Sequence, residues 1–209
     1  LGRGTYGVVV EGTYKDQAVA VKVGQAGGSN AARRMLKREI ASLTRLSSHP
    51  EQHDNICRFF GVLLPTRESG MRLVFELCTG GTLGDVVKRA RGSVDHPKRG
   101  CCAKALHGFP WAQRLAVLQQ VSAGLQHMHS LQIVHRDIKS SNVLLGAALP
   151  VWDGESEVVL PQAKIADVGL SRIATDSRVG SMTPLAHWRQ DRHPWMAPEL
   201  ATEDYGPPA

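Results

Sequence analysis

Three glycines at the start of the sequence have the spacing of a phosphate-binding loop. Gly2, Gly4 and Gly7 match the pattern G-x-G-x-x-G, whose glycines let the backbone approach phosphate groups closely. In one arrangement the last glycine opens a helix that meets a pyrophosphate, and in another the loop turns between two strands and covers a nucleotide. A glycine-rich turn that binds nothing is a third interpretation of the motif taken alone.

The residues after Gly7 favour the second arrangement. They read VVVEGTYKDQAVAVKV, a stretch rich in valine that breaks once, at the plausible turn YKDQ. This pattern predicts strand, turn and strand over residues 1 to about 24, without the helix that a dinucleotide-binding fold requires. A dinucleotide-dependent oxidoreductase is therefore excluded.

A second group of reactive side chains lies in the stretch HRDIKSSN. It places His135, Arg136, Asp137, Lys139 and Asn142 within eight residues, after a long helical pattern and before an apolar run. A polar group that is buried without a partner costs roughly 2–7 kcal/mol. So many polar groups between apolar elements therefore indicate a functional cluster.

Three further charged residues lie within apolar segments. Lys22 interrupts the strand AVAVKV, either as a lysine on an exposed strand edge or as part of a site. Glu39 lies 17 residues further on, beside the apolar stripe of a predicted helix, from where a carboxylate can reach back to the ammonium group of Lys22. Asp167 ends the strand-like run KIAD and precedes the permissive Gly169.

Taken in order, these residues form five motifs. They are Gly2-x-Gly4-x-x-Gly7-x-Val9, Val19-Ala20-Val21-Lys22, His135-Arg136-Asp137 with Asn142, Asp167-Val168-Gly169 and Ala197-Pro198-Glu199. In this order the motifs resemble the signature set of the protein kinases, over nearly the whole chain apart from insertions at about 91–108, 146–162 and 185–194. The resemblance implies an α+β fold of two lobes, with a small β-rich N-lobe at 1–77 and an incomplete, mainly helical C-lobe at 78–209.

The resemblance assigns roles in phosphoryl transfer, a reaction that depends mainly on positioning and on neutralising phosphate charge. Lys22 would hold the α- and β-phosphates of ATP while pairing with Glu39. Asp137 would act as the catalytic base that accepts the proton of a substrate hydroxyl. Lys139 would contact the γ-phosphate.

The resemblance also implies a nucleotide site with a metal ion beside it. Mg²⁺ would be held by Asp167 and Asn142, because hard oxygen ligands suit this ion. The adenine would meet the carbonyl of Glu76 and the amide of Cys78, and Asp85 would contact the ribose. The full set of implied ATP-binding residues is Leu1, Gly2, Gly4, Gly7, Val9, Ala20, Lys22, Glu76, Cys78 and Asp85.

Substrate class and regulation follow from the same motifs. The lysine at position 139 makes the motif resemble that of serine/threonine kinases. The wider group that the sequence resembles is the tyrosine-kinase-like group, which includes Raf, mixed-lineage and many plant kinases. This second resemblance lies in the strings HRDIKSSNVLL, KIADVGLSR and WMAPEL. The implied partners are ATP and a protein with a serine or threonine acceptor. The arginine at position 136, beside Asp137, resembles a feature of kinases that are activated by phosphorylation of a loop, because arginine pairs well with phosphate. An upstream kinase or the chain itself would modify the loop that contains Thr175, Ser177, Ser181 and Thr183.

The sequence departs from the kinase pattern in three places. Val168 replaces the phenylalanine of D-F-G, and the smaller side chain is expected to underfill its site at a cost of about 1–3 kcal/mol. The stretch TPLAHWRQDRHPWMAPE is longer than usual before the A-P-E motif. The chain stops ten residues after Glu199, so we expect a fragment without the later helices of the C-lobe. The alternative is a pseudokinase scaffold that binds nucleotide without efficient phosphate transfer.

Hydrophobic periodicity predicts the elements that position these residues. Residues 53–65 and 71–78 are short apolar runs typical of strands. A helix is predicted over 31–46, with Ser29 and Asn30 as its cap and an apolar stripe of Leu36, Ile40 and Leu43.

A second helix is predicted to begin at Pro110, since proline is tolerated in the first turn. The insertions at 91–108 and 146–162 lack periodicity and are predicted to be loops. The residues with helical spacing in the second helix are Leu115, Leu118, Ser122, Leu125 and Met128.

Composition excludes several other classes. The 209 residues have a formal net charge of +6, but the basic residues are scattered, so a nucleic-acid partner is not expected. No apolar run approaches the roughly 18 residues that span a membrane. The cysteines form no C-x-x-C pair, and reduced thiols in a cytoplasmic protein are expected. A metal site at Cys101, Cys102 and His107 is a minor alternative.

Overall fold

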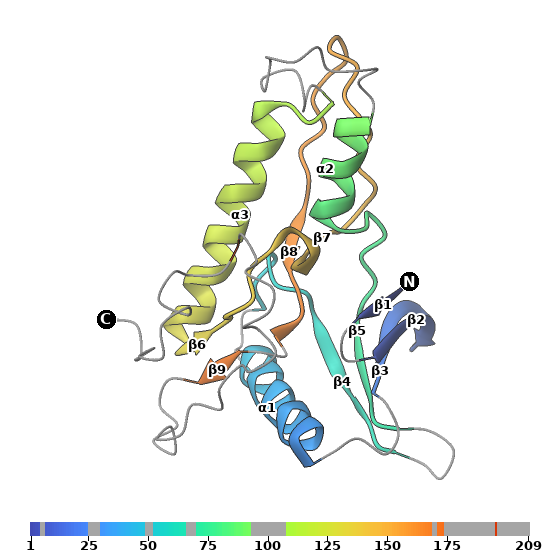
Figure 1. The fold of residues 1–209 in the computed structure, drawn as a ribbon, viewed down its shortest axis with the longest axis vertical. Coiled ribbons are helices and arrows are strands. Elements are labelled where there is room, and N and C mark those ends of the chain that lie inside the picture. Colours follow the sequence, from blue (N-terminus) through green and yellow to red (C-terminus); the bar gives the residue numbers. More distant parts are fainter. Residues whose placement is uncertain are drawn as a thin grey trace.

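The computed structural model describes residues 1–4, 7–24, 30–48, 52–65, 70–92, 108–168, 171–173 and 195. Its first part is an antiparallel sheet with the strand order β1-β2-β3-β5-β4, which places β3 between two neighbours (Figure 1). The strands are β1 (Gly2–Gly4), β2 (Gly7–Tyr14), β3 (Gln17–Val23), β4 (Phe59–Leu63) and β5 (Arg72–Glu76).

A tight hairpin joins β2 to β3. Its two turn residues, Lys15 and Asp16, both have positive φ angles of 49° and 60°. Such a turn has the twist that suits a two-residue connection between antiparallel strands. The prediction of strand, turn and strand is therefore confirmed, and a strand rather than a helix follows Gly7.

Helix α1 (Asn30–Ser47) lies beside the sheet. Leu43 is buried in a core cluster together with Leu73 of β5, and Leu36 and Ile40 pack against this cluster. The predicted helix and its apolar stripe are confirmed. Asn30 is the first residue of the helix rather than its cap, and Ser29 lies outside the described residues.

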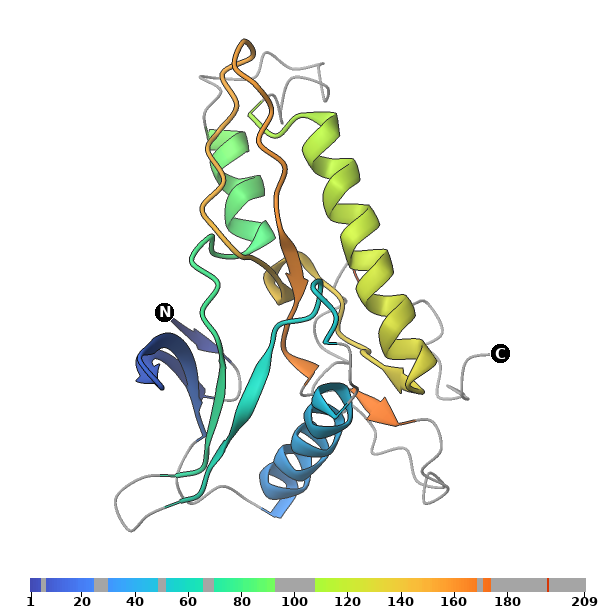
Figure 2. The same ribbon diagram turned by 180° about the vertical axis from the view of Figure 1, so that it is seen from behind.

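The second part of the described chain contains two further helices, a 3-10 helix and short strand pairs. The elements are α2 (Leu83–Gly92), α3 (Trp111–Ser130), β6 (Ile133–Val134), the 3-10 helix η2 (Ser140–Asn142), β7 (Val143–Leu145), β8 (Ala163–Ile165) and β9 (Arg172–Ile173). Strand β7 pairs with β8 and β6 with β9, both antiparallel. Figures 1 and 2 show α2 and α3 side by side. The predicted α+β fold is confirmed, with a β-sheet part followed by a part with helices.

Helix α2 was not predicted, and it shortens the first loop. Residues 91 and 92 belong to this helix rather than to the predicted insertion, and Gly108 at the other end is buried. The intervening residues of the predicted loop, with Cys101, Cys102 and His107, lie outside the described residues.

Helix α3 confirms the predicted second helix, but the residues with helical spacing are not all buried. Leu115 and Leu118 are 53% and 60% exposed, and Ser122 is exposed as well. Met128 is fully buried as expected, and Leu125 packs against the core. The buried face of the helix instead consists mainly of small side chains and a glutamine. The helix begins at Trp111, and Pro110 is its N-cap residue. The buried residues are Gln113, Ala116, Val117, Gly124 and Met128.

Small residues dominate that face because other chain segments lie very close to α3. A β-carbon added to Gly124 would lie 2.9 Å from the backbone oxygen of Asn55 and 2.9 Å from Cδ1 of Ile165. Real β-carbons essentially never approach other atoms below 3.0 Å. The glycine therefore allows the close contact between α3, β8 and the segment that leads into β4.

Residues 146–162 connect β7 to β8 and are called the arm below. They contain no helix or strand, as predicted for this loop, and extend along α2 and α3 (Figure 2). Two glutamines of α3 bind the main chain of the arm: Gln113 Nε2 donates to Val159 O and Gln120 Nε2 donates to Pro161 O, both at 2.8 Å. Leu149 anchors the arm in a second core cluster.

Replacement of Gly124 by alanine is expected to destabilise the protein. Helix propensity alone would favour alanine by about 1 kcal/mol, but the added methyl group overpacks the contact with Asn55 and Ile165, which costs roughly 1–3 kcal/mol. Urea unfolding of Gly124→Ala would measure the difference. Ser122→Ala, an exposed substitution in the same helix, is the matched control and should lower stability by no more than a few tenths of a kcal/mol. A Gly124→Ala protein as stable as Ser122→Ala would contradict the packing argument.

Candidate active site

Three segments that are far apart in the sequence meet at the side chain of Lys22. Its Nζ atom lies 2.6 Å from Oε1 of Glu39 on α1 and 3.0 Å from Oδ1 of Asp167, which follows β8. Both contacts are hydrogen-bonded ion pairs, which are stronger than neutral hydrogen bonds. The structure therefore brings together three of the residues that the sequence singled out.

The backbone determines the position of this lysine. Lys22 lies opposite Val9 of β2 on one side and Leu73 of β5 on the other, so it is on a central strand rather than on an exposed edge. Its side chain is only 15% exposed, and that of Glu39 is 7% exposed. The interpretation of Lys22 as a solvated edge lysine is wrong.

Burial and charge act in opposite directions on this group of residues. Burial opposes the positive charge of Lys22, but the carboxylates of Asp167 and Glu39 outweigh it, so the pKa of Lys22 is raised above 10.5. Burial also raises the pKa of Glu39 above 4.5, and the nearby lysine only partly offsets this effect. At neutral pH the lysine is thus a cation held next to two acids.

The side chain of Asp137 is held by its neighbours in the loop after β6. Asn142 Nδ2 donates to both the backbone oxygen and Oδ2 of Asp137 at 2.8 Å, and Lys139 Nζ lies 2.8 Å from the same Oδ2. These contacts orient the carboxylate while its side chain stays 13% exposed. The arrangement suits a group that accepts a proton from a bound molecule.

His135 connects this loop to the segment that carries Asp167. Its Nδ1 accepts a hydrogen bond from the backbone N–H of Asp137 at 3.2 Å, so Nε2 carries the proton and donates to Ala166 O at 3.1 Å. The ring is neutral in this arrangement. Burial lowers the pKa of His135 below 6.5 and outweighs the nearby carboxylates.

Two non-glycine residues of the site have strained backbones. Arg136 has φ of 69° and Asp167 has φ of 58°, both in the left-handed region. Such conformations cost about 1–3 kcal/mol each and gather at functional sites. Arg136 directly follows His135, and Asp167 directly follows Ala166. Both strained residues therefore lie next to the hydrogen bond that links the two segments.

The oxygen donors that the sequence assigned to Mg²⁺ come from adjacent segments. The backbone N–H of Ala166 donates to Asn142 O at 2.9 Å, which holds Asn142 beside the segment that carries Asp167. Because Nδ2 of Asn142 is committed to Asp137, the amide oxygen is the atom left for a ligand. A carboxylate and an amide oxygen are ligands that suit Mg²⁺. The residues present therefore fit this ion.

The predicted nucleotide-binding residues of the sheet lie on β1, β2 and β3. The register pairs Gly2 with Val9 and Gly4 with Gly7, so the three glycines belong to one antiparallel hairpin. The backbone nitrogen of Leu1 donates to Val9 O at 3.0 Å. Ala20 lies two residues before Lys22 on β3, so these side chains share one face of the sheet with Val9, which lies opposite Lys22.

The remaining nucleotide-binding candidates lie in the connection from β5 to α2. The backbone N–H of Glu76 donates to Arg58 O at 2.9 Å, and Cys78 follows two residues later. Asp85 lies in the first turn of α2 and reaches back to Thr82, which precedes the helix: its Oδ2 accepts from Thr82 N at 3.1 Å and from Thr82 Oγ1 at 2.7 Å. These hydrogen bonds lower the pKa of Asp85 below 3.8. The predicted ribose contact would have to share this carboxylate with Thr82.

Val168 stands where the kinase pattern has phenylalanine, and it was expected to underfill that site. Val168 is buried in the core cluster that contains Leu43 and Met128. Gly169, the predicted phosphorylation sites at 175–183 and the motif at 197–199 lie outside the described residues.

Sequence reasoning missed one ion pair and one pair of thiols. The carboxylate of Glu76 lies 3.0 Å from Lys164 Nζ, although only the backbone of Glu76 had been considered. The Sγ atoms of Cys57 and Cys78 lie within 4.8 Å of each other, and the neighbouring thiol together with burial raises the pKa of the Cys57 thiol well above 9.0. Neither contact has a local sequence signal, because the partners are 88 and 21 residues apart.

Comparisons with known proteins show the family to which the chain belongs. A family model described as "Protein tyrosine and serine/threonine kinase" matches residues 1–205. A probable serine/threonine-protein kinase from Dictyostelium discoideum is 32% identical over 185 residues, which are 88% of this chain and 37% of that protein. The serine/threonine-protein kinase STY17 from Arabidopsis thaliana is 30% identical over 198 residues, 94% of this chain and 28% of that protein. The chain thus spans about a third of the length of these relatives.

The neutral state of His135 predicts a pH-dependent stability. The unfolded chain binds a proton below about pH 6.5, whereas the folded chain does not until its lowered pKa is reached. The contribution of His135 to folding is therefore complete above pH 6.5 and is lost as the pH falls below it, at up to about 1.4 kcal/mol per pH unit. Unfolding free energies measured between pH 7.5 and 5.5 should decline less steeply for His135→Asn than for the unmodified protein.

The exposed His129 of α3 supplies the control. His129→Asn removes an imidazole without touching the buried one, so it should keep the pH dependence of the unmodified protein. Equal slopes for the unmodified protein and His135→Asn would show that His135 is not the group responsible.

Proposed function

The chain belongs to the protein kinase family, and we propose that it acts as a serine/threonine kinase that transfers the γ-phosphate of ATP to a protein hydroxyl. The observation that carries this proposal is the contact of Lys22 with both Glu39 and Asp167, at 2.6 and 3.0 Å. It unites residues from three segments, and Lys22 and Asp167 are 145 positions apart. A cation held in this way is ready to receive phosphate oxygens.

In the proposed reaction the chain's own residues position the groups and move one proton. The substrate hydroxyl donates its proton to the carboxylate of Asp137 as its oxygen bonds to the γ-phosphorus, and the bond from that phosphorus to the bridging oxygen breaks to release ADP. The contacts of Asn142 and Lys139 with Asp137 Oδ2 support this role, since they orient the carboxylate. Lys22 would bind the α- and β-phosphates. Mg²⁺ on Asp167 and Asn142 would neutralise phosphate charge.

The nucleotide would lie against the face of the sheet that carries Val9, Ala20 and Lys22. We assign its adenine to the backbone of Glu76 and Cys78, at the connection between the proposed lobes 1–77 and 78–209. The glycines of the first hairpin and Leu1 would cover the phosphates, and Asp85 would reach the ribose. These assignments rest on the match to the kinase motifs.

The proposed substrate is a protein with a serine or threonine acceptor. Two observations support this choice: Lys139 contacts the proposed base, and the two relatives described above are named as serine/threonine kinases. Membership of the tyrosine-kinase-like group stays a prediction from the motif strings. Regulation by phosphorylation at one of Thr175, Ser177, Ser181 and Thr183 is proposed on the same basis, by an upstream kinase or by the chain itself.

The free thiols of the described residues support a proposal for the location of the protein. Of the helices that the structure describes, none is long and apolar enough to cross a membrane. Cys57 and Cys78 are free thiols. Because free thiols persist where the surroundings are reducing, we propose a cytoplasmic location.

Loss of the proposed base is expected to remove activity. Transfer of labelled phosphate from Mg²⁺-ATP to a generic basic protein should fall by about 10²- to 10⁴-fold in Asp137→Asn, because proton acceptance is lost while the side-chain volume is kept. Asp16→Asn is the matched control: the same substitution in the exposed β2–β3 turn, where asparagine tolerates the positive φ. It should keep full activity.

The same assay distinguishes the kinase from the scaffold. A folded protein whose melting temperature rises with Mg²⁺-ATP, but which transfers no phosphate to any of several acceptor proteins, would support the pseudokinase. Transfer that persists unchanged in Asp137→Asn would contradict the role given to Asp137.

A further inference from the structure

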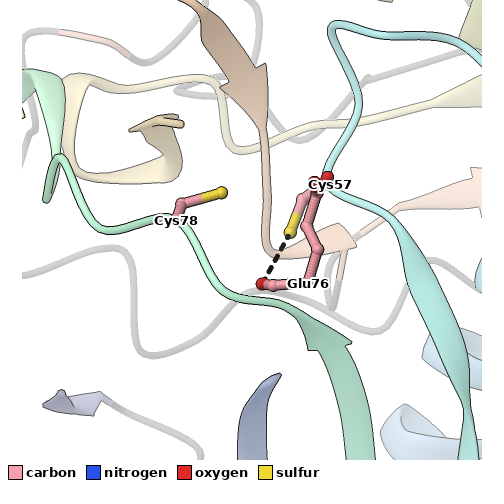
Figure 3. Close-up of side chains that lie close together, drawn as sticks. All are labelled: Cys57, Glu76 and Cys78. Carbon is pink, nitrogen blue, oxygen red and sulfur yellow. Dashed lines mark hydrogen bonds between the residues drawn. The ribbon is translucent and has the colours of Figure 1, made fainter. Parts of the chain in front are cut away.

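Two cysteines and a carboxylate lie close together where the connection from β5 to α2 begins. Cys57 precedes β4, Glu76 ends β5 and Cys78 lies two residues later. The two sulfur atoms and one carboxylate oxygen all lie within 4.8 Å of one another (Figure 3). Cys57 is buried at 7% exposure, and the other two residues are half-buried. We propose that these three residues form a binding site for a zinc ion.

The chemistry of the donor set selects the metal. Thiolates are soft ligands that favour Zn²⁺ over Mg²⁺ or Ca²⁺, and a carboxylate is a common third ligand of zinc. With bonds of about 2.3 Å to sulfur and 2.1 Å to oxygen, the ligands of a tetrahedral zinc ion lie roughly 3.3–3.8 Å apart. Side chains already within 4.8 Å need only small movements to reach that spacing. Three protein ligands leave the fourth position for water.

The surroundings of the carboxylate orient it and balance the charge. Oε1 of Glu76 accepts from the backbone N–H of Arg58 at 2.6 Å and pairs with Lys164 Nζ at 3.0 Å. Ligating carboxylates in metal sites are held by such partners. Two thiolates and one carboxylate carry three negative charges, which Zn²⁺ and the ammonium group of Lys164 would together neutralise. Lys164 is only 11% exposed, so this neutralisation matters.

The site would join segments that belong to different parts of the fold. The residues around Cys57 are tied to β8, because Cys57 N donates to Ile165 O and Ile165 N donates to Asn55 O, both at 2.8 Å. Cys78 belongs to the chain that leads from the sheet to α2. A zinc ion shared by Cys57 and Cys78 would therefore fix this connection against β8. This role does not depend on phosphate transfer, so it stands apart from the proposed kinase activity.

Cobalt provides a spectroscopic test. The protein is prepared with a phosphine reductant, freed of metal with a chelator and titrated with Co²⁺, whose thiolate charge-transfer and d–d bands report sulfur ligands in a tetrahedral site. One equivalent of Co²⁺ should produce these bands, Zn²⁺ should abolish them, and Zn²⁺ should raise the melting temperature. Fully reduced protein that shows no such bands with Co²⁺ would overturn the proposal. The proposal would also be overturned if the two thiols bound no metal and only formed a disulfide on exposure to peroxide.

Variants locate the site. Cys57→Ala and Cys78→Ala should each lose the bands, and Glu76→Gln should weaken Co²⁺ binding by about tenfold or more. The double variant Cys101→Ala with Cys102→Ala is the matched control, because it removes two thiols elsewhere and should keep both the bands and the affinity. Because Cys57 is buried, a thermal transition is measured for each metal-free variant to verify that it folds. If Cys57→Ala does not fold, the variant of the half-buried Cys78 decides the test. Bands lost in the control and kept in Cys78→Ala would overturn the assignment.

Discussion

The ammonium group of Lys22, placed between the carboxylates of Glu39 and Asp167, is the interaction on which the arrangement of the site depends. Two carboxylates that both contact one ammonium group, of which that of Glu39 is buried, would repel each other without a cation between them. The backbone of this lysine is held in place, because its strand is paired on both sides. Glu39 and Asp167 therefore take their positions relative to the sheet, and α1 and the segment after β8 are drawn to the same point.

A hydrophobic core cluster packs next to this charged group. The core cluster joins Leu43 of α1, Leu73 of β5 and Met128 of α3 with Ile165 and Val168, which lie on either side of Asp167 in the sequence. The apolar residues that flank Asp167 thus hold it in its strained conformation, while His135 links the segment to the loop of Asp137. Hydrophobic burial stabilises this region, and the hydrogen bond of His135 to Ala166 O links two of its segments.

The sequence predicts the members of the site better than their contacts. Lys22, Asp137 and Asn142 are recognisable because residue type and local spacing mark them, and strands β2 and β3 follow from alternation and a turn. The buried face of α3 could not be predicted, because leucines at helical spacing do not reveal which side meets the rest of the chain. The face that makes contact depends instead on how closely β8 approaches the helix, and Gly124 permits that approach. The proximity of Cys57 to Cys78 likewise depends on the path of the backbone.

The attachment of the arm has a consequence for how this protein can diverge. Gln113 and Gln120 bind carbonyl oxygens of the arm, and Gln120 Oε1 also accepts from the backbone N–H of Ala163 at 2.6 Å. Every residue type offers the same carbonyl group, so these contacts place few demands on the side chains of the arm. Its outer surface is therefore free to accumulate substitutions over evolutionary time, while the two glutamines of α3 and the buried Leu149 are under selection to stay.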